Sequence, residues 1–125
     1  MMEITWFNEK PKDLVVTLAA GNITLNKPAT VYFENAFSVM LGIDKMKKLI
    51  VIKPLSKAEA MRHDIPDSSK YRITVRSSYS RVTNKAFMDE ICELAGLNLN
   101  VETHKFKATW NHKDQILLVD LKEEM

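Results

Sequence analysis

The chain has few of the residues that mark disulfide frameworks and glycine-rich nucleotide loops. Its 125 residues include one cysteine, three glycines and four prolines. A single cysteine cannot form an intramolecular disulfide, and an oxidising compartment is not indicated. Three glycines leave little room for a phosphate-binding loop or a dinucleotide-binding pattern, and neither motif is present. The sequence therefore does not point to the nucleotide-dependent enzymes built on those loops.

Long apolar runs and sorting signals are also missing. Residues 1–6 lack the basic start and apolar core of a signal peptide. No apolar stretch approaches the roughly 20 residues that cross a bilayer. We therefore expect a cytoplasmic protein that has no membrane partner.

Neither sign of charge is in large excess: the chain has 18 Lys and Arg and 16 Asp and Glu, for a net charge of +2. So small an excess does not imply a polyanionic partner. The distribution is less even: residues 70–113 hold eight bases and four acids, whereas residues 114–125 hold one base and four acids. A weakly basic region next to an acidic tail is predicted, and ordinary solubilising charge is the simpler explanation for it.

Aliphatic residues, in contrast, are abundant and come in dense runs at 14–16, 49–52 and 116–119. A chain of this length usually forms one hydrophobic core, so we predict a single domain over residues 1–125. Residues 1–13 contain Trp6 and Phe7 before Pro11. They are either an arm or an edge strand, and the sequence does not distinguish the two.

One order of structural signals occurs twice, which indicates an internal duplication. Residues 14–27 align without a gap on residues 72–85, although identity is nearly confined to the Asn-Lys pairs that end both stretches. The predicted units are residues 14–54 and 71–122, with a linker at 55–70 between them. The linker carries the capping-box spacing Ser56–Glu59, which favours a short helix. The chain is thus predicted to be an α+β fold made of two strand–strand–helix–strand–strand (ββαββ) units.

In the first unit, strands at 14–18 and 23–25 flank a turn over residues 19–22, where Gly21 and Asn22 tolerate positive φ. Asn26 can cap a short helix that includes Pro28 in its first turn and runs to residue 35. Strands at 37–41 and 49–53 follow. Pro54 is predicted to end the pairing, because proline has no N–H to donate.

The second unit repeats this order. A hairpin of residues 71–76 and 79–83 turns at Ser77-Ser78, and Asn84 caps a helix over 85–97 with apolar residues on one face. Gly96 can end that helix in the left-handed conformation. Strands at 106–110 and 115–122 close the unit.

The stretch from Gly21 to Asp44, followed by residues 48–54, resembles the AbrB/MraZ superfamily of bacterial regulators. Members run from a hairpin with a Gly-Arg turn, through an alternating strand and a short helix started by proline, to a final hairpin. The resemblance covers about residues 14–122. It implies a pseudo-twofold swapped-hairpin β-barrel with short helices, here in tandem duplicated form, as well as DNA binding and a homo-oligomer.

Several of the family's characteristic positions are altered in this chain. Asn22 follows the turn glycine where the family usually has Arg, and Asn26 stands where it has Pro. Thr30 replaces a basic residue often found on the short helix. In the second unit Tyr79-Ser80 stands where Gly-Arg is expected.

Basic residues of the second hairpin are the candidate DNA-binding surface. Arg72 and Arg76 are an even number of residues apart and project from one face of a strand, and Arg81 lies on the partner strand. Arg can bind phosphate bidentately and read guanine edges in the major groove. A solvated strand face is the alternative explanation for these charges. The full candidate set is Arg72, Arg76, Arg81, Lys85, Lys27, Lys45, Lys47 and Lys48.

No catalytic or metal site is predicted. A nucleophilic thiol needs a nearby base and electropositive surroundings, whereas Cys92 is predicted to lie among acidic residues beside the apolar face of its helix. The three histidines, His63, His104 and His112, are scattered and lack the spacing of a zinc site.

The leading hypothesis is a non-enzymatic DNA-binding transcriptional regulator of the AbrB/MraZ type. It would bind double-stranded DNA, associate with further copies of itself, and need no cofactor and no small-molecule substrate. The alternative is a structural or protein-interaction module that retains the barrel and has lost DNA binding.

Overall fold

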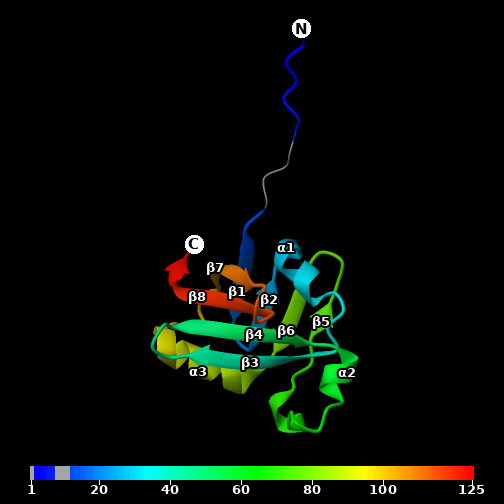
Figure 1. Ribbon diagram of the computed structural model, residues 1–125. Coiled ribbons are helices and arrows are strands. Elements are labelled where there is room, and N and C mark those ends of the chain that lie inside the picture. Colours follow the sequence, from blue (N-terminus) through cyan, green and yellow to red (C-terminus); the bar gives the residue numbers. More distant parts are fainter. Residues whose placement is uncertain (1, 8–11) are drawn as a thin grey trace.

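The structure is a computed structural model that describes residues 2–7 and 12–125. It has an α+β fold in which eight antiparallel strands form one curled, half-barrel sheet, with a few short helices (Figure 1). The elements in chain order are β1 (Leu14–Ala19), β2 (Asn22–Leu25), α1 (Lys27–Thr30), η1 (Val31–Phe33), β3 (Ser38–Asp44), β4 (Leu49–Leu55), α2 (Lys57–Ala60), η2 (Asp67–Ser69), β5 (Thr74–Val75), β6 (Ser80–Thr83), α3 (Lys85–Ala95), β7 (His104–Asn111) and β8 (Ile116–Glu124).

The strands lie in the order β3-β4-β8-β7-β1-β2-β6-β5. The two terminal strands of this order approach each other, because an isolated bridge joins Val39 of β3 to Tyr71, which precedes β5. The Val39 N–H donates to the Tyr71 carbonyl at 2.9 Å, and the Tyr71 N–H donates to the Val39 carbonyl at 2.8 Å. The sheet therefore curls until its ends touch at one point.

The interior of the curl is filled by alternate residues of the strands. In β6, for example, Ser80 and Val82 are buried while Arg81 and Thr83 are exposed, as period-two alternation requires. One hydrophobic cluster draws on residues before the linker and after it, and Phe33 and Phe106 are its largest members.

The caps that were predicted from the sequence are present. Asn26 accepts from the Ala29 N–H at 3.2 Å and Asn84 from the Phe87 N–H at 2.8 Å. Gly96 ends α3 with φ 67°, in the left-handed region that favours glycine. Ser56 and Glu59 form the capping box of α2. Local sequence rules therefore account for where these helices begin and end.

The prediction for Pro54 was wrong, because β4 continues through it to Leu55 and Pro54 pairs with Val39. Val39 directs its backbone groups to Tyr71 instead of to β4. The nitrogen of Pro54 consequently points away from β3, on the side where pairing with β8 has already ended at Ile52. Proline loses no ladder hydrogen bond at that position.

The gapless alignment of the two hairpins was displaced by one residue. Ala19 pairs with Asn22 across one two-residue turn, and the Arg76 N–H donates to the Tyr79 carbonyl at 2.8 Å across the other. The counterparts of Ala20-Gly21 are therefore Ser77-Ser78, as the predicted second turn requires. From turn to helix cap, the second hairpin is therefore one residue longer: Asn84 lies six residues after Ser78, whereas Asn26 lies five residues after Gly21.

Residues 2–7 form no strand in the structure and are exposed. Of the two interpretations of the N-terminal segment, the arm is the one that the described residues 2–7 adopt (Figure 1). Among the described residues, no helix is both long enough and apolar enough to span a membrane.

Candidate nucleic-acid interface

The outer face of the sheet carries a row of hydroxyl and basic side chains across five strands. The register pairs Lys105 of β7 with Thr17, Thr17 with Thr24, Thr24 with Arg81 and Arg81 with Thr74. Directly paired residues point to the same face of a sheet, and adjacent strands are about 4.8 Å apart. The row is therefore a continuous polar strip that extends roughly 19 Å around the curl.

The predicted arginines of the second hairpin share this outer face. Arg72, Thr74 and Arg76 are exposed, whereas Ile73 between them is buried. Arg72 and Arg76 thus flank Thr74, which is the partner of Arg81. Strand alternation through Thr74 therefore puts Arg72, Arg76 and Arg81 on the exposed side of the β5–β6 hairpin, and we call these three residues the basic face.

Arg81 is held against the sheet by two contacts. Its Nε donates to the Thr24 hydroxyl at 3.3 Å, and its guanidinium carbon lies 5.2 Å from the centroid of the Tyr79 ring. Arg81 is nevertheless exposed to solvent. Within residues 2–7 and 12–125, no carboxylate forms an ion pair with any arginine of the basic face.

Two of the predicted lysines lie at opposite ends of β6. Lys27 opens α1 directly after β2, whose last residue Leu25 pairs with Ser80, so Lys27 lies near the β5–β6 turn. Lys85 opens α3 beyond the other end of β6 and pairs with Asp89 at 3.4 Å. Lys27 can therefore extend the basic face, whereas the charge of Lys85 is partly compensated.

The remaining predicted lysines, Lys45, Lys47 and Lys48, are exposed in the β3–β4 turn. That turn is bonded to the end of β8, because the Leu121 N–H donates to the Lys48 carbonyl at 3.0 Å and Lys122 donates to the Lys47 carbonyl. Lys45 also borders a hollow that contains Glu90 and Glu93. The structure does not bring these three lysines together with the basic face.

Sequence reasoning missed Lys105, which joins the polar strip through β7. The signal that could have found it is the alternation Lys105-Phe106-Lys107 around a buried Phe106, but the pairing of β7 with β1 cannot be derived from local sequence. Lys107 has the same orientation, yet it lines a surface hollow with Asp13 and Glu123. Acidic groups thus border the strip on its β7 side.

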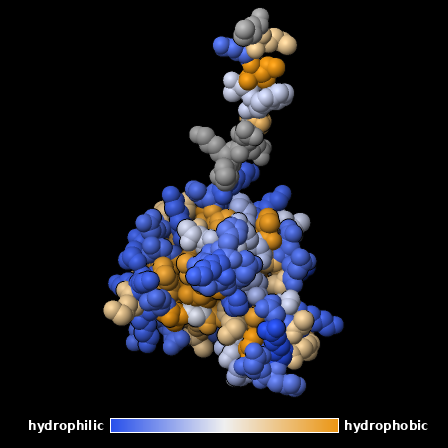
Figure 2. Space-filling view, viewed as in Figure 1, coloured by the Kyte–Doolittle hydropathy of each residue, from blue (hydrophilic) through white to orange (hydrophobic). Residues whose placement is uncertain are grey.

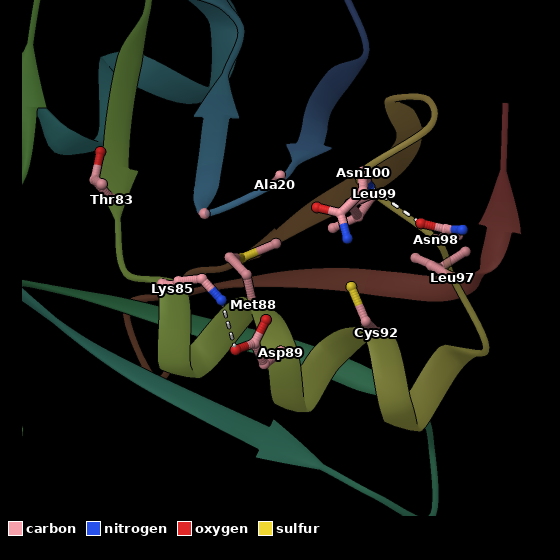
Figure 3. A pocket seen from close by; sticks show the side chains of 11 residues that line it. Ala20, Thr83, Lys85, Met88, Asp89, Cys92, Leu97, Asn98, Leu99 and Asn100 are labelled. Atoms are coloured by element: carbon pink, nitrogen blue, oxygen red, sulfur yellow. Dashed lines mark hydrogen bonds and ion pairs between the residues drawn. The ribbon is translucent and has the colours of Figure 1, made fainter.

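A hollow of about 300 Å³ lies between α3, the β1–β2 turn and the loop at 97–100. The sulfur atoms of Met88 and Cys92 point into it, and Lys85 and Asp89 face each other at its rim (Figure 3). No histidine is among the residues that line it. Across the residues that the structure describes, no group of three or more His, Cys, Asp or Glu side chains is placed to hold a metal ion. The basic face is the feature of this molecule with the clearest chemical preference, which is for anions.

The fold and this surface define a small α+β protein with a curled antiparallel sheet, whose β5–β6 hairpin exposes three arginines that form no ion pair with a carboxylate of residues 2–7 and 12–125. No protein-family model matches the chain, and neither a curated protein nor a solved structure matches it.

Proposed function

We propose that the protein is a non-enzymatic DNA-binding regulator of the AbrB/MraZ type, built from two ββαββ units that interlock as a swapped-hairpin barrel. The observation that carries the DNA-binding proposal is the basic face. Three arginines share one exposed surface without a carboxylate partner among the described residues, and arginine forks match the geometry of phosphate and guanine.

The strand pairings support the duplication. If the first four strands are exchanged with the last four, in order, the pairs β1·β2 and β3·β4 become β5·β6 and β7·β8. The pairs β2·β6 and β4·β8 map onto themselves. The pair β1·β7 would become β5·β3, which is not among the pairings of the sheet; an isolated bridge joins Val39 of β3 to Tyr71, three residues before β5. Every other pairing is unchanged by the exchange, as a duplication predicts.

The turns before β4 and β8 give independent support. Lys48 and Gln115 have positive φ values of 55° and 54°, and each directly precedes its strand. Four residues before each of them, a side-chain oxygen accepts a backbone N–H three residues ahead: Asp44 from Lys47 at 3.0 Å and Asn111 from Asp114 at 3.0 Å. The two turns therefore share one conformation, as corresponding turns of a duplicated unit would, although the same turn is also common in unrelated hairpins.

Fluorescence anisotropy with a labelled duplex at two salt concentrations tests DNA binding. If the basic face and Lys27 neutralise about four phosphates, the slope of log K against log salt is roughly −3 to −4. The double variant Arg76→Ala/Arg81→Ala should lose the binding and keep its thermal stability, because exposed charges contribute little to folding.

The matched control is Lys45→Ala/Lys47→Ala, which removes the same charge from the β3–β4 turn. It should retain most of the affinity if the basic face binds DNA. Equal weakening by both double variants would show that only overall charge matters. Absence of binding at micromolar protein in low salt would refute the proposal.

One observation favours the alternative, a protein-interaction module that has lost DNA binding. The altered family positions are occupied by structural contacts within the chain. Asn26 caps α1 and donates to the Asp13 carbonyl, Thr30 bonds to Ser80, and Asn22 accepts from Thr83. A pull-down that captures a protein partner, combined with no DNA binding, would favour this function.

A further inference from the structure

The N-terminal arm, residues 2–7, is an exposed apolar segment without a partner in the described chain. The exposed fractions are 84% for Met2, 57% for Ile4, 78% for Trp6 and 87% for Phe7. Apolar side chains so concentrated and so exposed usually mark an interaction site. The arm stands away from the body, with its apolar atoms in solvent (Figure 2).

From Met2 to Trp6 the arm has the pattern of a strand with one apolar face, whereas Phe7 falls on the face of Glu3 and Thr5. Met2, Ile4 and Trp6 alternate with Glu3 and Thr5, and Ile, Thr, Trp and Phe all favour extended backbone on a half-buried surface. A strand cannot form alone, because its N–H and C=O groups need a neighbouring strand. The arm therefore has the sequence of a strand but is paired with no strand among the described residues.

The sheet offers one such edge, along β3 beyond Val39. Backbone groups of alternate residues point to the same side, so those of Leu41 and Ile43 point away from β4 as those of Val39 do. No backbone partner for these two residues on that side occurs among the described residues. An extension of the Val39–Tyr71 bridge would need Ser69 and Asp67 opposite them, but those residues turn away in η2.

The open edge of β3 also borders a hollow of about 270 Å³ against α3, lined by Ile43, Lys45, Glu90, Glu93 and Leu94. A strand added to β3 would continue its alternation. One face would join Leu41 and Ile43, which pack against the core, and the other would join outward-facing Gly42 and Asp44. The apolar face of the arm suits the first environment, and Glu3 and Thr5 suit the second.

We propose that the arm of one copy adds as a strand to the β3 edge of a second copy, and that two copies exchange arms to form a symmetric dimer. Addition of a strand at a sheet edge is a common mode of association, and closed twofold symmetry satisfies both edges at once. The arm's own β3 is badly placed, because β4, β8 and β7 separate β1 from β3 and the arm leaves the opposite border of the body (Figure 1).

Sedimentation velocity over a range of concentration tests the proposal with the full chain. The wild-type chain should be a dimer at high micromolar concentration. Ile4→Pro should make it monomeric, because proline removes the N–H and the extended pairing of the arm, and should leave the melting temperature of the dilute protein unchanged. Glu3→Gln, on the polar face of the arm, is the matched control and should remain dimeric.

A cysteine pair identifies the edge. In the Cys92→Ala background, Thr5→Cys chains are mixed with chains carrying Met40→Cys or Asp44→Cys and then oxidised. A disulfide-linked heterodimer supports the exchange. A monomeric wild-type chain, a dimer that Ile4→Pro leaves intact, or a disulfide within one diluted chain carrying both cysteines would each overturn it.

Discussion

The buried hydrogen bond between Thr30 and Ser80 allows a quantitative test of how the two halves are joined. Thr30 ends α1 in the first half and Ser80 begins β6 in the second, and their hydroxyl oxygens are 2.9 Å apart. Thr30 is 3% exposed and Ser80 is fully buried. Thr30 also donates to the Leu25 carbonyl at 3.3 Å. A hydroxyl has one hydrogen, so we assign Ser80 as the donor between the two side chains, and the variants below test that assignment.

This direction makes the two deletions unequal. Ser80→Ala removes a donor, and Thr30 keeps its bond to Leu25, so the loss should be about 0.5–1.5 kcal/mol. Thr30→Val leaves the Ser80 hydroxyl buried without a partner and also removes the donor to Leu25, so the loss should be about 1–3 kcal/mol. The double variant has no Ser80 hydroxyl left without a partner. Its loss of unfolding free energy should therefore be smaller, by about 1 kcal/mol, than the sum of the losses of the two single variants.

Urea unfolding, followed by tryptophan fluorescence and circular dichroism, measures these differences in unfolding free energy. The dependence of the free energy on urea concentration should be the same for all variants. Thr74→Val, at an exposed position of β5, is the control and should change stability by less than about 0.5 kcal/mol. Equal losses for the two single variants would refute the assigned donor. Strict additivity would refute the contact between the halves.

Two further predictions concern the helix caps. Asn84→Ala should cost about 0.5–2 kcal/mol in urea unfolding, because α3 loses the bond from the Phe87 N–H, and Asn84→Ser should restore most of it. The Ser56 backbone N–H donates to Glu59 and holds the pKa of that carboxyl below its usual range. The ionised Glu59 carboxylate therefore stabilises the folded state at pH values above its pKa in the unfolded chain. This stabilisation is lost as the pH falls through the lower pKa of the folded state. Glu59→Gln should thus lower the melting temperature near neutrality and match the wild-type chain in calorimetry at roughly pH 3.

The features that the sequence predicted well are those set by neighbouring residues. Asn84, Gly96 and the Ser56–Glu59 box define helix ends through contacts within one turn, so local chemistry suffices. The Ser77-Ser78 turn was predicted for the same reason. Most strand boundaries were approximate, because a strand ends where its partner ends. Pro54 shows this most clearly: its missing N–H has no effect only because β8 no longer pairs there.

The candidate site depends both on local sequence patterns and on the pairing of strands that are distant in sequence. That Arg72 and Arg76 share a face follows from strand alternation alone. The separation of Lys45, Lys47 and Lys48 from them follows from the sheet order, which no local pattern encodes. Lys105 was missed for the same reason, since β7 is adjacent to β1 and far from it in sequence.

The sheet order has a consequence for synthesis of the chain. β1, β2 and β4 each have one neighbour from the second half, namely β7, β6 and β8. A nascent polypeptide that ends before residue 104 therefore exposes the apolar edges and faces of its early strands, and the last pairings await β8. Such long-range closure is slow compared with local folding. The apolar strands of the first half therefore lack part of their pairing until β7 and β8 have been synthesised.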